Sequence, residues 1–154
     1  MTGRCTVLVC GDVARGDDGA AIAAVARLAP FKRTGVRVRV IGQLQPDDLI
    51  DALSDGRCVV VDAVRGIEPG QVVEVPLEAV SGPAGPQPAS SHALPVRTAI
   101  GLAQVLGADM SRASFIGIGG SAFGLGFGLS PAVENGLGRA VATIDRAIHE
   151  AEVA

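Results

Sequence analysis

The chain has 154 residues, of which 48% are hydrophobic and 19% are charged. This length allows one globular domain with its own core, and the composition excludes disordered and fibrous classes of protein. The formal net charge is −3, from 13 basic and 16 acidic residues, and lacks the basic surplus typical of nucleic-acid-binding proteins. We therefore expect a single domain over residues 1–154 and no nucleic-acid partner.

Cysteine content and hydropathy bear on location. Cys5, Cys10 and Cys58 are odd in number and lack Cys-x-x-Cys spacing, and the N-terminus lacks the basic-then-apolar layout of a secretory signal. Both features favour a reducing, cytoplasmic location. The uncharged run Phe115–Val133 is too rich in glycine for a stable spanning helix, so we expect no membrane segment.

Runs rich in Val and Ile alternate along the chain with helical patterns. Most of the apolar runs lack polar alternation, which indicates strands buried on both faces. Ser130 before Pro131 is typical of a helix start, and Gly56 and Gly107 lie where helices should end. In chain order, the predicted elements are a strand over Thr6–Cys10, a helix over Asp18–Leu28, a strand over Val36–Ile41, a helix over Pro46–Leu53, a strand over Cys58–Val61, a short edge strand over Val72–Pro76, a helix over about Leu94–Leu106, a strand over Phe115–Ile118 and a helix over Pro131–Ala151.

This alternation predicts an α/β fold. We expect a single-domain, three-layer sandwich in which helices cover both faces of a mostly parallel, twisted sheet. Sheets of this kind bind ligands beyond the carboxyl ends of their strands. The residues that follow the predicted strands are therefore the first candidates for a functional site.

The turn after the first predicted strand runs from Gly11 to Gly19 and contains two adjacent aspartates, Asp17 and Asp18. Its Gly-x4-Gly spacing resembles a phosphate-binding loop, but the aspartates occupy the helix N-terminus where a phosphate would bind, and they would repel it. One aspartate is readily explained as a helix cap. The second is more than a cap requires and is a candidate for chemistry.

Asp62 and His92 are predicted to reach the same edge of the sheet. Asp62 follows the buried run Val59–Val61, and His92 opens the helix after the Pro-rich loop Gly82–Ser91. Structural roles are open for both, since Asp62 could accept turn amides and His92 could be a cap or a solvated side chain. The other histidine, His149, is assigned to the surface of the last helix.

Two carboxylates and one imidazole from three segments form a mixed oxygen and nitrogen set that suits a divalent transition metal with open positions. The sequence contains no His-Glu-x-x-His motif, so the ordinary zinc-protease arrangement is excluded, and no Gly-x-Ser-x-Gly motif indicates a serine hydrolase. Cys5 and Cys58 are interpreted as core residues. Cys10 is either core or close enough to approach a bound metal.

Four ordered motifs give the chain a resemblance to a known family. They are the acidic turn Gly11–Gly19, Val61-Asp62-Ala63 followed by Pro69-Gly70, Ser91-His92-x-Leu94, and Gly128-Leu129-Ser130-Pro131-x-Val133-Glu134. Over nearly its whole length the chain resembles the hydrogenase maturation proteases, which trim the C-terminal tail of the nickel-iron hydrogenase large-subunit precursor.

The resemblance implies an aspartyl-type maturation endopeptidase that cuts the precursor after nickel insertion. It assigns Asp18, Asp62 and His92 as the residues that bind nickel, which the substrate supplies or shares, and as the catalytic set. A carboxylate of this set or a metal-polarised water would activate the attack. Departures from the family pattern, such as Asp12 in place of the usual Asn and Gln43-Leu44-Gln45 in place of Gly-Gly-Thr, bear on substrate choice.

Two other functions remain open from the sequence. One is a non-catalytic, nickel-dependent maturation checkpoint or chaperone that uses the same ligands, and the other is an α/β small-ligand-binding domain. The sequence also predicts that Gly119–Gly128 is a mobile substrate-contacting loop whose Phe123, Leu125 and Phe127 form an apolar surface. The alternative is that these three side chains close over the core.

Overall fold

The computed structural model describes residues 4–28, 34–82, 85–89 and 95–153. Its strands form one sheet with the order β2-β1-β3-β6-β4, and β5 pairs with β3 beside this path. The β1–β2, β1–β3 and β3–β6 pairs are parallel, whereas β4 and β5 run antiparallel to their neighbours. The strands are β1 (Cys5–Cys10), β2 (Val36–Gly42), β3 (Arg57–Arg65), β4 (Val72–Pro76), β5 (Gln87–Pro88) and β6 (Ala113–Gly119).

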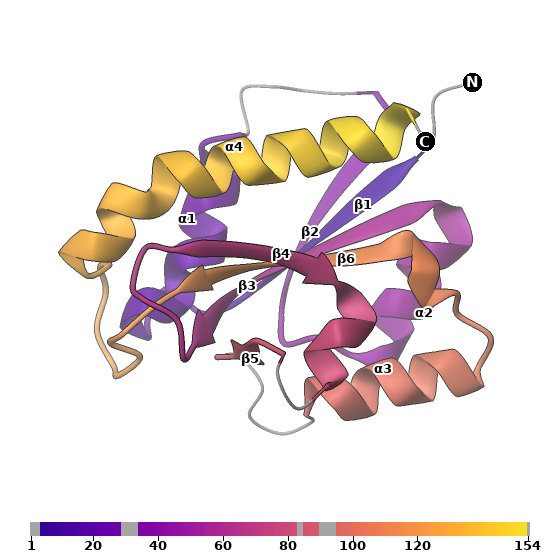
Figure 1. The fold of residues 1–154 in the computed structure, drawn as a ribbon, viewed down its shortest axis with the longest axis horizontal. Coiled ribbons are helices and arrows are strands. Elements are labelled where there is room, and N and C mark those ends of the chain that lie inside the picture. Colours follow the sequence, from indigo (N-terminus) through magenta and orange to yellow (C-terminus); the bar gives the residue numbers. More distant parts are fainter. Residues whose placement is uncertain (1–3, 29–33, 83–84, 90–94, 154) are drawn as a thin grey trace.

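Helices cover both faces of this sheet, as Figure 1 shows. One face packs against α1 and α4, and the other packs against α2, α3 and the short helix η2. The predicted three-layer α/β sandwich with a mostly parallel sheet is therefore confirmed. The helices are η1 (Gly16–Gly19), α1 (Ala20–Ala26), α2 (Pro46–Asp55), η2 (Leu77–Ser81), α3 (Val96–Val105), η3 (Met110–Arg112) and α4 (Pro131–Val153).

The central strands carry two cores, one on each face. Along β3, Val59 and Val61 belong to the core under α1 and α4, whereas Val60 belongs to the core under α2 and α3. Cys5 and Cys10 of β1 divide in the same way and face opposite sides of the sheet. The alternation follows from strand geometry, in which successive side chains point to opposite faces.

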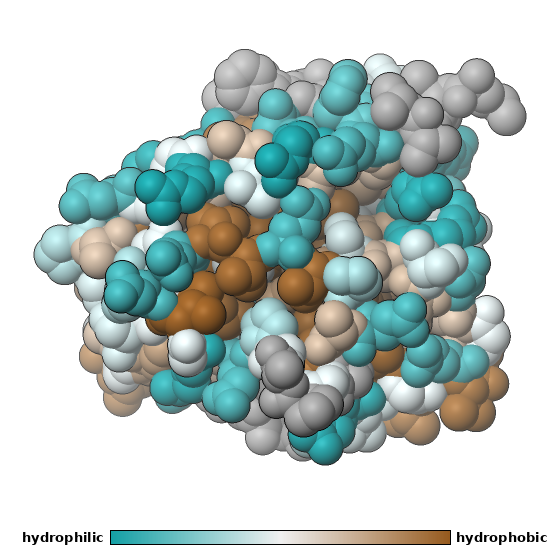
Figure 2. Space-filling model, viewed as in Figure 1, coloured by the Kyte–Doolittle hydropathy of each residue, from teal (hydrophilic) through white to brown (hydrophobic). Residues whose placement is uncertain are grey.

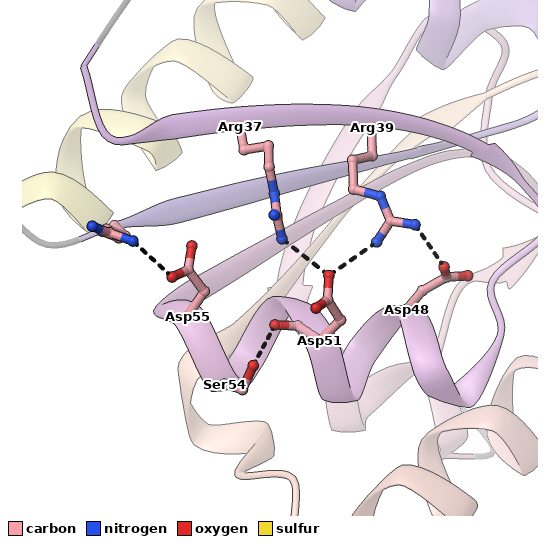
Figure 3. Close-up of polar contacts among 7 residues, drawn as sticks. Arg37, Arg39, Asp48, Asp51, Ser54 and Asp55 are labelled. Atoms are coloured by element: carbon pink, nitrogen blue, oxygen red, sulfur yellow. Dashed lines mark hydrogen bonds and ion pairs between the residues drawn. The ribbon is translucent and has the colours of Figure 1, made fainter.

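The expectation of strands buried on both faces, which the sequence indicates for most of the apolar runs, does not hold for Val36–Ile41, because β2 is an edge strand. Val38 and Val40 are 48% and 61% exposed. Arg37 and Arg39 alternate with these valines and extend over α2, where their guanidinium groups lie 3.0 and 3.4 Å from the Asp51 carboxylate (Figure 3). The strand is exposed in part on both faces because it lies at the edge of the sheet.

The strand β4 forms the opposite edge, as its alternating sequence predicts. Its valines Val72, Val73 and Val75 are half-buried. Figure 2, drawn in the same view as Figure 1, shows hydrophobic residues gathered on the surface around β4. Among the described residues, none of the helices combines the length and apolar composition needed to cross a membrane.

Several element boundaries differ from the prediction. The helix predicted over Asp18–Leu28 divides at Gly19 into η1 and the shorter α1. The strand β3 continues to Arg65, beyond the predicted end at Val61, because Val64 still pairs with β6 and with Pro88 of β5. The short strand β5 lies within the Pro-rich segment, where the sequence predicted only a loop.

Candidate functional site

The turn after β1 folds back onto η1. Gly11 has φ of +128°, and a Cβ atom there would overlap the backbone carbonyl oxygen of Asp18. The Gly11 N–H donates to the Gly42 carbonyl at 2.8 Å, and the Asp12 N–H donates to the Asp18 carbonyl at 3.2 Å. Only glycine fits this close approach. The turn therefore holds Asp18 against the carboxyl end of β1.

Asp62 lies at the same level of the sheet. It follows the last β1–β3 pair, Val9 with Val61, and it is in register with Gly117 of β6. The expectation that Asp62 ends its strand is wrong, since β3 runs three residues further. The consequence is deep burial: Asp62 and Asp18 are each only 2% exposed.

The charges of both carboxylates act on the buried thiol of Cys10. Burial raises the pKa of Cys10 well above its ordinary value, and the carboxylates of Asp62 and Asp18 are among the nearby groups that raise it further. Asp62 and Asp18 thus both lie within electrostatic reach of one buried side chain. The backbone places Asp18 in the turn after β1 and Asp62 one residue past the last β1–β3 pair, so both lie at the carboxyl end of the parallel strands, where the fold predicts a ligand site.

Asp17 has a different role from Asp18. Its carboxylate is fully buried and accepts hydrogen bonds from the Ser121 N–H at 2.9 Å, the Ala122 N–H at 3.0 Å, the Ser130 N–H at 2.7 Å and the Ser130 hydroxyl at 2.7 Å. Burial raises the pKa of Asp17, but these hydrogen bonds outweigh it and leave the pKa below its ordinary value. Asp17 is a charged anchor for the segment from Ser121 to Ser130.

The explanation of one aspartate as a helix cap is wrong for this turn. The capping positions of η1 and α1 are Arg15 and Gly19, and neither cap makes a side-chain hydrogen bond. Asp17 instead reaches across more than 100 residues of sequence to the start of α4. The sequence analysis did not predict the hydrogen bonds between Asp17 and Ser130. Their one local signal is the position of Ser130 directly before Pro131.

The glycine-rich loop Gly119–Gly128, which follows β6 (Figure 1), is hydrogen-bonded to the turn after β1. Gly126 donates to the Ala14 carbonyl and accepts from the Gly16 N–H, both at 2.8 Å. Within the loop, Phe123 is only 9% exposed and lies under the Arg65 guanidinium, 4.2 Å from the ring centre. The prediction that three apolar side chains of this loop form one surface is therefore corrected for Phe123, which belongs to the core.

The other two apolar side chains of the loop are exposed, Leu125 by 88% and Phe127 by 82%. The predicted third ligand, His92, lies outside the described residues. On one side of it, the Ala89 N–H donates to the Ala63 carbonyl at 2.8 Å, one residue beyond Asp62. Among the described residues, no three His, Cys, Asp or Glu side chains are grouped to hold a metal, so Cys10 does not complete a set with the two aspartates.

Comparison with known proteins identifies the family. A family model described as hydrogenase maturation protease matches residues 28–147. The chain belongs to the hydrogenase maturation protease family. The matched range includes Asp62 and His92 and begins after Asp18.

Solved structures of maturation proteases share the fold. The chain is similar to the nickel-iron hydrogenase maturation protease HybD from Thermococcus kodakarensis, with 25% identity, a TM-score of 0.72, and coverage of 94% of this chain and 99% of the other. It is also similar to the hydrogenase maturating endopeptidase HybD from E. coli, with 17% identity, a TM-score of 0.77, and coverage of 96% and 93%. No curated protein matches the chain at a significant level.

Proposed function

We propose that this family member is an endopeptidase that removes the C-terminal extension of a nickel-iron hydrogenase large-subunit precursor after nickel insertion. The observation that carries the proposal is the burial of two carboxylates, Asp18 and Asp62, at the carboxyl end of the parallel strands. The family match and the similarity to a nickel-iron hydrogenase maturation protease over 94% of the chain support the choice of substrate.

In this proposal nickel belongs to the precursor, and the protease recognises it. Asp18, Asp62 and His92 would hold the ion, because carboxylate oxygens and imidazole nitrogen suit a divalent transition metal. The donor chemistry therefore fits nickel, which would report that the precursor is ready for cleavage.

The same side chains can serve hydrolysis. A carboxylate beside the scissile carbonyl accepts a proton from the attacking water, and the leaving amine gains a proton as the peptide bond breaks. The burial of Asp18 and Asp62 excludes bulk water from them, which strengthens their electrostatic effect on a bound peptide.

Variants of the three side chains test the proposal. Asp18→Asn, Asp62→Asn and His92→Ala should each lower the rate of precursor cleavage at least about 100-fold, the scale of losing a positioned acid–base group. His149→Ala is the matched control, because His149 is exposed on α4, and it should cleave at the wild-type rate. Circular dichroism would check that each variant is folded.

Two outcomes would contradict the proposal. Wild-type rates in the Asp62→Asn and His92→Ala variants would remove these residues from the site. Nickel-dependent binding of the precursor without any shortening by the wild-type protein would instead indicate a maturation checkpoint.

A further inference from the structure

We infer that Val13, Leu125 and Phe127 form a preorganised docking surface for an apolar segment of the hydrogenase precursor, and that Asp17 is the residue that positions it. This inference rests on the proposed function, because the precursor is the occupant. The three side chains are 46%, 88% and 82% exposed. We call them the apolar rim.

Leu125 and Phe127 of the apolar rim stand on an anchored loop, and Val13 lies in the turn after β1 to which Gly126 of that loop is hydrogen-bonded. Asp17 receives four hydrogen bonds of 3.0 Å or less from Ser121, Ala122 and Ser130, and its own N–H donates to the Ala122 carbonyl at 2.7 Å. Phe123 packs into the core between these anchor points. The loop is therefore fixed at both ends and in its middle, while Leu125 and Phe127 remain outside the core. These contacts favour an ordered loop over the predicted mobile one, and hydrogen exchange of residues 119–128 in the free protein would distinguish the two.

The apolar rim is continuous with the candidate site. Gly126, which separates Leu125 from Phe127, is hydrogen-bonded to Ala14 and Gly16 in the turn that leads directly to Asp18. A side chain bound against the rim would thus lie on the same pair of loops that place the Asp18 carboxylate.

The occupant follows from this continuity. Nickel and the scissile bond both belong to the precursor, so its chain must pass the loops that carry Asp18. Large apolar side chains exposed together on a fixed loop mark a binding surface, and burying them releases water from both partners. Because the loop is already ordered, little conformational entropy is lost when the precursor binds. A second copy of this chain is the competing occupant and is an outcome of the test.

The experiment compares Leu125→Ser and Phe127→Ser with Leu106→Ser. Leu106, at the end of α3, is 68% exposed and is not part of the apolar rim, so its variant controls for loss of an exposed leucine. Precursor binding is measured by fluorescence anisotropy with fluorescently labelled, nickel-loaded precursor, and cleavage kinetics are measured separately. We expect each rim variant to raise Kd and KM about tenfold, with kcat changed far less, and Leu106→Ser to match the wild type.

Asp17→Asn tests the positioning role. Once the anchor is weakened, Phe127→Ser should raise Kd less than it does in the wild-type background, a coupling that a purely structural aspartate would not show. If Asp17→Asn does not fold, the single rim variants still decide the question.

Wild-type Kd and KM in both rim variants would overturn the inference while leaving the proposed function intact, because cleavage is scored independently. A change in self-association by sedimentation, without a change in precursor Kd, would assign the rim to a second copy and also overturn it. Failure of the wild type to cleave a precursor that it binds through the rim would contradict the proposed function alone.

Discussion

Asp17→Asn should cost this protein a large part of its stability. In the wild type one carboxylate oxygen accepts from the Ser130 N–H, and the other accepts from Ser121, Ala122 and the Ser130 hydroxyl. The asparagine side chain has only one acceptor oxygen, and its NH2 group would face an N–H donor of the protein. The remaining hydrogen bonds would be made to an uncharged oxygen. One charged bond, worth about 1.5–3 kcal/mol, is lost, and each of the other three weakens to the about 0.5–1.5 kcal/mol of a neutral bond, so the free energy of unfolding should fall by about 4–8 kcal/mol.

Thermal and urea denaturation followed by circular dichroism measure this loss, and Tm should fall by roughly 10 °C or more. Asp109→Asn is the control, since Asp109 also accepts from Ser111, at 2.6 and 3.1 Å, but is exposed, and its variant should lose much less. The pKa of Asp17 is lowered from its ordinary 3.8, so its contribution is present above that value and is lost as the pH falls through the lowered pKa. The gap between the wild type and Asp17→Asn should therefore narrow below about pH 4. A loss of unfolding free energy no larger than that of Asp109→Asn would refute the anchoring role of Asp17.

Two further predictions concern glycines and thiols. Gly136→Ala should destabilise the fold by more than about 1 kcal/mol, because the added Cβ would overlap the Gly70 carbonyl oxygen. Gly138→Ala lies in the same helix, and its Cβ would meet nothing within 4 Å, so this variant should be stabilised by up to about 1 kcal/mol. Equal changes in the free energy of unfolding, measured by urea titration, would contradict this prediction. Burial raises the pKa of Cys5 to about 11 and of Cys58 to about 12, so a disulfide reagent at pH 8 should label neither thiol until denaturant is added, and rapid labelling of the native protein would show that the strands open.

The sequence predicts the layers of this fold because buried parallel strands and amphipathic helices have distinct hydrophobic periods. Helix starts were also predictable where local chemistry fixes them. Pro46 and Pro131 begin α2 and α4 as expected, and Gly56 caps α2. Burial was harder to predict, since the alternating Val and Arg residues of β2 could be judged only once its place at the sheet edge was known.

The candidate site was predictable in its location and less so in its roles. Asp18 lies in the turn after β1, and Asp62 lies in β3 one residue past the last β1–β3 pair. The strand order therefore brings both to one end of the sheet. The role of Asp17 could not be predicted from local sequence, because all its side-chain partners lie more than 100 residues away. Phe123 and Phe127 share one loop and similar neighbours, and only the packing of that loop separates a core residue from an exposed one.

The central claim is that the protein cuts one bond of a hydrogenase precursor and that nickel in the precursor licenses the cut. Intact-mass spectrometry of nickel-loaded and nickel-free precursor, each incubated with the wild-type protein, tests it directly. We predict a single shortened large subunit and one released C-terminal fragment in the nickel-loaded sample only. With the Asp62→Asn variant, the masses of the nickel-loaded and the nickel-free precursor should both stay unchanged. Equal shortening of nickel-free precursor, or an unchanged mass for the nickel-loaded one, would contradict it.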